Sequence, residues 1–168
     1  MNLLLLRHSN AEDVPPPGQV GDQFRRLTTD GREKARIIGR AIQRIEPGIT
    51  RVLTSPAARA LETAEDVVSQ LEPRPPLEPC AGLWIGGDIR GVVTRLRPLD
   101  SDDGGILLVG HEPDLGRLVS RLLTGGVDLR LVFKKGGLCK LSVRRLTAGR
   151  CATLEWLLTP RQLRMLAE

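Results

Sequence analysis

The sequence contains no tyrosine, and aromatic residues make up only 2% of its 168 residues. The core must therefore consist mainly of leucine, valine, isoleucine and alanine. Proteins that bind single-stranded nucleic acids stack the bases on aromatic side chains, and this sequence lacks such platforms. The net charge of +5 arises from arginines that are scattered along the chain. We therefore expect a solvated basic surface, with a focused positive cleft for an anionic ligand, and no nucleic-acid partner.

Cysteines and long apolar runs are also scarce. Cys80, Cys139 and Cys151 are odd in number and form no close pair, so they indicate neither a disulfide framework nor a metal knuckle. Two histidines without an acidic cluster do not make a metal site, so we expect no metal and no cofactor. No stretch approaches membrane-spanning length, and the apolar N-terminal run is too short for a signal peptide. These absences predict a cytoplasmic protein without a membrane partner, with a monomer as the default.

Strand-like and helix-like segments alternate along the chain. At this length the simplest organisation is one domain over residues 1–168. Residues 3–6 are four consecutive leucines, and residues 106–109 form a second apolar run, as expected for strands buried on both faces. Residues 138–145 and 151–158 resemble a hairpin. This order indicates an α/β fold, a three-layer sandwich whose mostly parallel central sheet is flanked by helices.

Helices are predicted from apolar residues at helical spacing and from capping residues. Thr28 or Thr29 is expected to cap the first helix, and Asp88 a later one. Ser55-Pro56 is interpreted as an N-cap followed by proline at the first helical position. The remaining segments are assigned more simply: residues 83–85 and 127–133 as strands, and the proline-rich residues 73–79 as a connecting loop.

Cationic and imidazole side chains follow the predicted buried strands. Arg7 and His8 come directly after residues 3–6, and His111 follows residues 106–109 after one glycine. Arg59 lies about one turn into the helix that follows a strand at residues 49–54. Ligands of open parallel sheets bind just beyond the carboxyl ends of the strands. We therefore expect these four side chains to meet in one cleft.

The chemistry that suits such a cleft is phosphoryl transfer. Guanidinium groups bind phosphate oxygens with two parallel hydrogen bonds and remain charged. Helix N-termini add amide donors for an anion. One imidazole can attack phosphorus and form a covalent intermediate, while a second, cationic imidazole stabilises the transition state.

Four motifs in order, LLLLRHSNAED, RRLTTDG, RVLTSPAARALET and ILLVGHEPDLG, resemble the histidine phosphatase superfamily, which includes the phosphoglycerate mutases. The short chain and its missing insertions resemble the small SixA-type phosphohistidine phosphatase branch. The resemblance covers most of the chain and implies a phosphoglycerate mutase-like fold. It also implies a phosphatase that uses no metal.

The resemblance assigns roles by position. It implies that His8 is the nucleophile, that Arg7 and Arg59 bind the phosphate, and that His111 is the second histidine of the pocket. Arg25 matches a further basic residue of the pocket, although the adjacent Arg26 is an alternative. Ser9 stands where the family usually has glycine, and its hydroxyl could donate to the phosphate.

The resemblance also bears on the substrate. Larger members use a glutamate as general acid, and the corresponding position here is Gly82. A phosphate ester needs its alkoxide protonated, whereas phosphohistidine has a better leaving group. The missing acid thus favours a phosphohistidine-bearing protein, such as a phosphotransfer domain. Glu12 and Asp88 remain substitute acids. Two alternatives stay open, a phosphatase for a small phosphate ester or anhydride, and a phosphate- or partner-binding module with little turnover.

Overall fold

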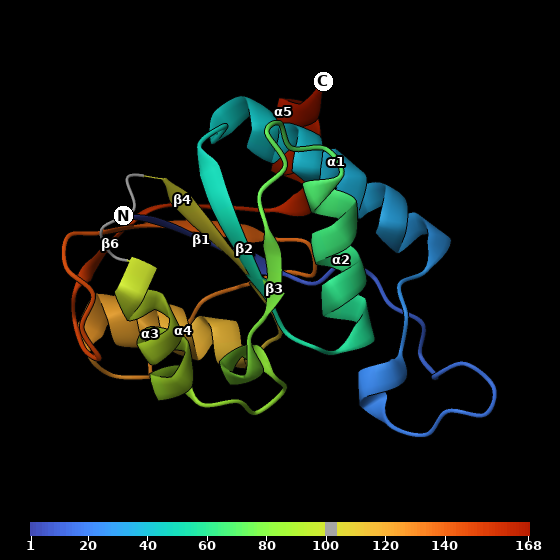
Figure 1. The fold of residues 1–168 in the computed structure, drawn as a ribbon, viewed down its shortest axis with the longest axis horizontal. Coiled ribbons are helices and arrows are strands. Elements are labelled where there is room, and N and C mark those ends of the chain that lie inside the picture. Colours follow the sequence, from blue (N-terminus) through green and yellow to red (C-terminus); the bar gives the residue numbers. More distant parts are fainter. Residues whose placement is uncertain (100–103) are drawn as a thin grey trace.

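The computed structural model describes residues 1–99 and 104–168, and a six-stranded sheet runs through its centre (Figure 1). The strand order is β3-β2-β4-β1-β5-β6. Four neighbouring strands are parallel: β3 (Leu77–Pro79), β2 (Ile49–Thr54), β4 (Gly105–Gly110) and β1 (Asn2–Arg7). The hairpin of β5 (Leu138–Val143) and β6 (Ala152–Leu158) pairs antiparallel beside β1. The predicted mostly parallel sheet is confirmed.

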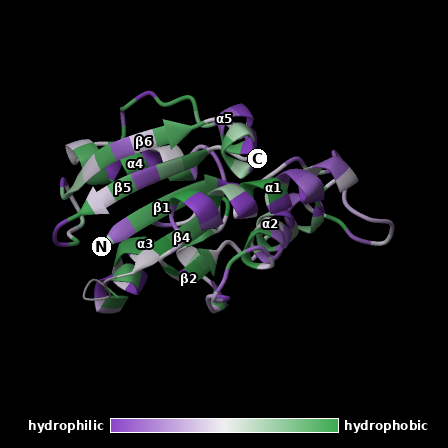
Figure 2. Cartoon of the chain, turned by 90° about the horizontal axis from the view of Figure 1, so that it is seen from above, coloured by the Kyte–Doolittle hydropathy of each residue, from purple (hydrophilic) through white to green (hydrophobic). Residues whose placement is uncertain are grey.

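Helices cover both faces of the sheet, as predicted for a three-layer sandwich. One face carries α1 (Thr29–Ile45), α2 (Ala58–Val68) and α5 (Pro160–Ala167), and the other carries α3 (Ile89–Leu96) and α4 (Asp114–Thr124). Because side chains alternate along a strand, the four leucines of β1 divide between two cores: Leu4 and Leu6 pack under α1 and α2, and Leu3 and Leu5 under α3 and α4. Each fully buried leucine contributes about 1.5–3 kcal/mol. The central strands are accordingly mostly hydrophobic in Figure 2.

Two of the predicted helix caps are present. The Thr28 hydroxyl accepts the Gly31 N–H at the start of α1, and Asp88 accepts the Arg90 N–H at the start of α3. Gly31 is needed here because a Cβ atom would lie 2.0 Å from the carbonyl oxygen of Asn10. The first turn of α1 therefore packs directly on the loop that follows β1.

Residues 83–85 and 127–133 do not form the predicted strands. A short 3-10 helix, η2 (Ala81–Leu83), precedes Trp84, and residues 127–133 have no regular structure. Backbone groups of the latter segment bond to side chains instead of to a strand: Leu129 N–H donates to the Ser120 hydroxyl, and the Phe133 carbonyl accepts from Arg7. Of its apolar residues, Phe133 is buried in the core under α3 and α4 and Leu131 packs against that core, whereas Val127, Leu129 and Val132 are exposed.

The proline-rich segment 73–79 is not only a loop, because its end forms β3 beside β2. Proline is tolerated there since β3 lies at the edge of the sheet. A 3-10 turn, η3 (Arg97–Leu99), follows α3. The sequence predicts an acidic, glycine-rich loop at residues 99–105, and most of it lies outside the described residues. Within the described ranges, no helix combines the length and the apolar character needed to cross a bilayer.

Candidate active site at the ends of β1 and β4

The two histidines come together because β1 and β4 are neighbours. Arg7 ends β1 in register with Gly110, which ends β4, and the His8 N–H donates to the Gly110 carbonyl at 2.9 Å. His111 follows Gly110 directly. The ring centroids of His8 and His111 are 5.1 Å apart, with the rings tilted by 54°. Two residues separated by most of the chain thus form one site.

The hydrogen bonds of His8 define which of its ring nitrogens carries the proton. Its Nδ1 lies 2.7 Å from the carbonyl oxygen of Ser9, and because a carbonyl can only accept, Nδ1 carries the proton. The other nitrogen, Nε2, therefore has the lone pair. It accepts a hydrogen bond from Nε of Arg59 at 3.3 Å. His8 is held as a neutral base with Nε2 facing the arginine.

Both imidazoles are kept uncharged by their surroundings. Burial lowers the pKa of His8 to about 3, against the bond to Ser9, and the nearby positive charges act in the same direction as burial. Burial also lowers the pKa of His111 to about 4, with Arg59 acting in the same direction. Both rings are thus free bases near neutral pH. A bound phosphate dianion would favour their protonated forms.

His111 is oriented by a residue that the sequence analysis assigned to a helix cap. Its Nε2 lies 2.8 Å from the Ser55 hydroxyl oxygen. The backbone N–H of Ser55 donates to the Val109 carbonyl, which fixes Ser55 at the end of β2 beside β4. Helix α2 begins only at Ala58, with Ala57 as its N-cap, so the predicted Ser55 cap is wrong. The position of Ser55 directly after a predicted strand was the one sequence feature that could have indicated a site residue.

Arg59, in the first turn of α2, carries the buried guanidinium of the site. Its Nη1 donates to the carbonyl oxygen of Asp22 at 2.7 Å, and its Nη2 to the carboxylate Oδ2 of the same residue at 2.6 Å. Asp22 begins the short helix η1 (Asp22–Phe24) in the segment between β1 and α1. A single aspartate in a glycine-containing loop gave no sequence signal, so Asp22 was missed.

The two adjacent arginines of the second motif point to different partners. Arg25 donates to Asp22 Oδ1 at 2.7 Å and is thereby linked to Arg59. Arg26 donates to the Glu62 carboxylate at 2.5 Å instead. Of the two alternatives, the structure connects Arg25 to the site.

Arg7 and Ser9 flank His8 in the chain. Arg7 Nη1 donates to the Phe133 carbonyl at 2.7 Å, and burial lowers the pKa of Arg7, against the charge of Glu112. The Ser9 N–H donates to the Thr63 hydroxyl of α2 at 3.1 Å. None of the described non-glycine residues has a positive φ, so serine is accommodated at position 9 without backbone strain.

Unpaired polar atoms gather at this site. Arg7 Nε, Ser9 Oγ and His111 Nδ1 are buried without a hydrogen-bond partner, and among the described residues only Arg51 Nε shares this condition. A buried polar atom without a partner costs about 1–3 kcal/mol. Three such atoms around His8 indicate that the site is built to receive a polar ligand.

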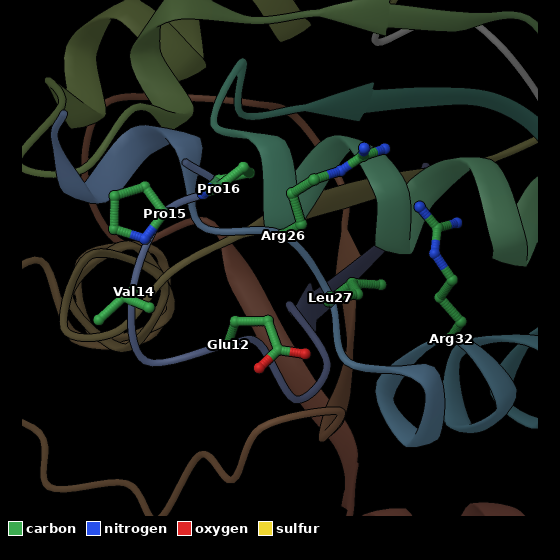
Figure 3. Close-up of a pocket in the computed structure, with 7 residues that line it drawn as sticks. All are labelled: Glu12, Val14, Pro15, Pro16, Arg26, Leu27 and Arg32. Carbon is green, nitrogen blue, oxygen red and sulfur yellow. The ribbon is translucent and has the colours of Figure 1, made fainter. Parts of the chain in front are cut away.

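The substitute acids proposed from sequence lie elsewhere. Glu12 lines a neighbouring cavity of about 500 Å³ (Figure 3), where Arg26 and Arg32 point toward α2. Asp88 caps α3. At Gly82, a Cβ atom would lie 2.7 Å from the backbone nitrogen of Val92, so α3 leaves no room for an acidic side chain there.

A carboxyl group that the sequence analysis overlooked lies beside the site. Glu112 accepts the Gly116 N–H at 3.0 Å, and burial raises its pKa, against the charge of Arg7. In the part of the chain that the structure describes, no three His, Cys, Asp or Glu side chains gather in a way that could hold a metal ion.

The paired histidines, the buried arginine and the strand-end position define a phosphoryl-transfer site on a phosphoglycerate mutase-like fold. Comparisons with known proteins agree. The sequence model of the histidine phosphatase superfamily (branch 1) matches residues 3–84. An uncharacterized protein of Picosynechococcus sp. is 32% identical over 143 residues, 84% of each chain. The chain belongs to the histidine phosphatase superfamily, and it is a hydrolytic phosphatase.

Two further relatives cover almost the whole chain. The phosphohistidine phosphatase SixA of Escherichia coli (strain K12) is 28% identical over 172 aligned positions, 98% of each chain. The solved structure of the protein histidine phosphatase SixA complexed with tungstate superposes with a TM-score of 0.82 at 28% identity, over 97% of this chain and 99% of that one. The predicted likeness to the SixA-type branch is confirmed.

Proposed function

We propose that this protein is a phosphohistidine phosphatase that removes phosphate from a phosphohistidine-bearing protein through a phosphorylated His8. The observation that carries the proposal is the environment of His8: a neutral imidazole with its Nε2 lone pair against Arg59, surrounded by buried polar atoms that lack partners. Arg7, Arg59 and His111 bind the phosphoryl oxygens. Arg25 and the Ser9 hydroxyl add further hydrogen bonds.

In the first step the Nε2 lone pair of His8 attacks phosphorus, and the bond between phosphorus and the substrate's imidazole nitrogen breaks. The electron pair of that bond leaves with the imidazole, which takes up a proton. The Ser9 carbonyl stabilises the positive charge that forms on His8, because it accepts the hydrogen bond of the Nδ1–H group. The guanidinium groups offset the negative charge of the transition state.

In the second step water attacks the phosphorus of phospho-His8. The bond to Nε2 breaks, its electron pair returns to His8, and inorganic phosphate leaves after the water loses a proton. His8 is then again the neutral base of the resting site. Arg59 re-forms its contact with Nε2.

The choice of substrate follows from the leaving group. Once its ring is protonated, phosphohistidine releases a neutral imidazole readily, whereas an alkoxide needs an acid. The packing of Val92 against Gly82 excludes a side chain at the position where larger relatives carry that acid. The SixA proteins that resemble this chain are phosphohistidine phosphatases by name, which supports the same class of substrate here.

The test compares two phosphodonors, a phosphohistidine-bearing phosphotransfer domain and an aryl phosphate, by release of inorganic phosphate. We expect rapid loss of the phosphohistidine and slow aryl hydrolysis. His8→Ala should abolish turnover and phosphoenzyme labelling, whereas Arg26→Ala, an arginine variant directed at Glu62, should retain both. Full activity of His8→Ala would overturn the mechanism. Phosphate binding without release from either donor would identify a binding module instead.

Glu112 favours one alternative function, hydrolysis of a small phosphate ester. Its carboxyl group is held at the start of α4, next to His111 in the chain, and burial favours its protonated form. Such a group can protonate an alkoxide leaving group. Faster hydrolysis of an ester than of phosphohistidine, with loss of the ester activity in Glu112→Gln, would favour this alternative.

A further inference from the structure

Asp22 occupies the guanidinium group that the proposed function assigns to the substrate's phosphate. Arg59 directs one nitrogen to His8 and the other two to Asp22, one to its carbonyl and one to its carboxylate. The second carboxylate oxygen accepts from Arg25. One carboxylate oxygen of Asp22 thus takes Nη2 of Arg59 and the other takes Nη1 of Arg25, and a bound phosphate would need the same guanidinium donors.

The contact between Asp22 and Arg59 has the features of one that a ligand can replace. The Asp22 side chain is 51% exposed, whereas that of Arg59 is 6% exposed. Asp22 lies in the segment between β1 and α1, which projects from the body of the molecule in Figure 1. Glycines with positive φ precede it at positions 18 and 21. The arginine is fixed in the protein, and the carboxylate approaches it from a surface loop.

The neighbouring arginines keep Asp22 in its anionic form. Burial acts to raise the pKa of Asp22, but the bonds and charges of Arg25 and Arg59 outweigh it and hold the pKa below its usual value. Asp22 is therefore an anion near neutral pH. It neutralises part of the positive charge that would attract a phosphate dianion.

We propose that Asp22 is an internal competitor of phosphate that sets the affinity of the site for anions. The proposal rests on the proposed function, since it requires that Arg59 bind phosphate. The substrate's phosphoryl group displaces the carboxylate from Arg59. After hydrolysis the carboxylate returns and promotes release of inorganic phosphate. The site thereby disfavours free phosphate and selects donors that bring additional contacts.

If Asp22 is a competitor or if it is a structural support, removal of its carboxylate changes the affinity for phosphate in opposite directions. If Asp22 only positioned Arg59, its removal would weaken phosphate binding. If it competes, the neutral variant Asp22→Asn should bind inorganic phosphate about tenfold more tightly, because a charge-assisted hydrogen bond no longer has to be replaced. In turnover assays, inorganic phosphate should inhibit this variant at correspondingly lower concentration.

The experiment is a calorimetric titration of the protein with inorganic phosphate at low ionic strength. Asp30→Asn is the matched control, because it removes one exposed carboxylate that pairs with Lys34 on α1 and not with Arg59. We expect tighter binding in Asp22→Asn and an unchanged affinity in Asp30→Asn. Unfolding in urea checks that both variants are folded, and Asp22→Ala provides a second neutral variant if Asp22→Asn is not.

Arg59→Ala separates the two proposals. If it weakens phosphate binding while Asp22→Asn leaves the affinity unchanged or lower, Arg59 binds phosphate and only the competitor role is overturned. If the phosphate affinity of Asp30→Asn rises as much as that of Asp22→Asn, the effect is due to net charge, and the competitor role is overturned. If Arg59→Ala leaves the affinity unchanged, or if none of the proteins binds phosphate, the assignment of Arg59 fails and with it both proposals.

Discussion

Helix α2 carries two arginine–carboxylate networks on neighbouring turns, and they differ in how they are enclosed. Toward the sheet end, Arg59 is the buried partner, and the carboxylate comes from an exposed loop. Toward α1 the roles are reversed. The buried partner is the Glu62 carboxylate, which accepts the backbone N–H of Leu27 and the side chains of Arg26 and Arg32.

The difference separates a site from a structural support. Glu62 has all its acceptors satisfied by the protein, and Arg32 extends the network to Asp66. A ligand that displaced these arginines would leave the buried charge of Glu62 unpaired, which is costly. Around Arg59, by contrast, buried polar atoms of three nearby residues lack partners. The same chemistry thus stabilises the fold on one turn of the helix and, on the previous turn, lies among polar atoms without partners.

The largest effect is expected from Arg59→Ala, which should lower kcat/KM by about 10²- to 10³-fold. The loss arises because a buried guanidinium no longer offsets the charge of the transition state. Steady-state kinetics with the phosphohistidine donor measures it. Arg26→Ala serves as the comparison from the other network and should leave kcat/KM unchanged. Equal losses in both variants would erase the distinction between the networks.

Glu62→Ala should act on stability instead, lowering the free energy of unfolding by about 3 kcal/mol. Its removal leaves the Leu27 N–H and Arg26 without this acceptor, and Arg32 keeps only its contact with Asp66. Urea unfolding measures the change, with Glu65→Ala as the exposed control on the same helix. Activity per folded molecule should be retained. A loss of activity without a loss of stability would place Glu62 in the site.

The smallest predicted effect is the pH dependence of the free energy of unfolding. Both histidines have pKa values lowered by burial in the folded state, to about 3 and about 4. Below an unfolded-state pKa of about 6.5 the unfolded chain binds protons that the folded chain does not, so stability falls as pH decreases. At pH 5 each histidine should account for about 2 kcal/mol of this loss.

Urea midpoints at pH 7.5 and pH 5 test this expectation. His111→Gln should lose about 2 kcal/mol less than the unaltered protein between these two values, because one depressed pKa is removed. An identical pH dependence in His111→Gln would show that His111 titrates normally.

Much of the fold could be predicted because its signals are local. The leucine run of β1 and the caps Thr28 and Asp88 each depend on a few neighbouring residues, and the structure confirms them. The assignments that failed depended on distant partners. Ser55 has the local pattern of a cap, but α2 begins only at Ala58 and the Ser55 hydroxyl contacts His111. Residues 127–133 have the pattern of a strand, but their backbone bonds to side chains from elsewhere in the chain.

The sequence by itself determined the alternation of strands and helices, and placed Arg7, His8, Arg59 and His111 at strand or helix ends, because hydrophobic period and capping are properties of short segments. It also carried the family resemblance. Only the tertiary structure decided which nitrogen of His8 holds the lone pair, that Ser55 orients His111, and that Asp22 faces Arg59. These relations join residues separated by 37 to 56 positions, except for the bond to Ser9, and no local pattern encodes them.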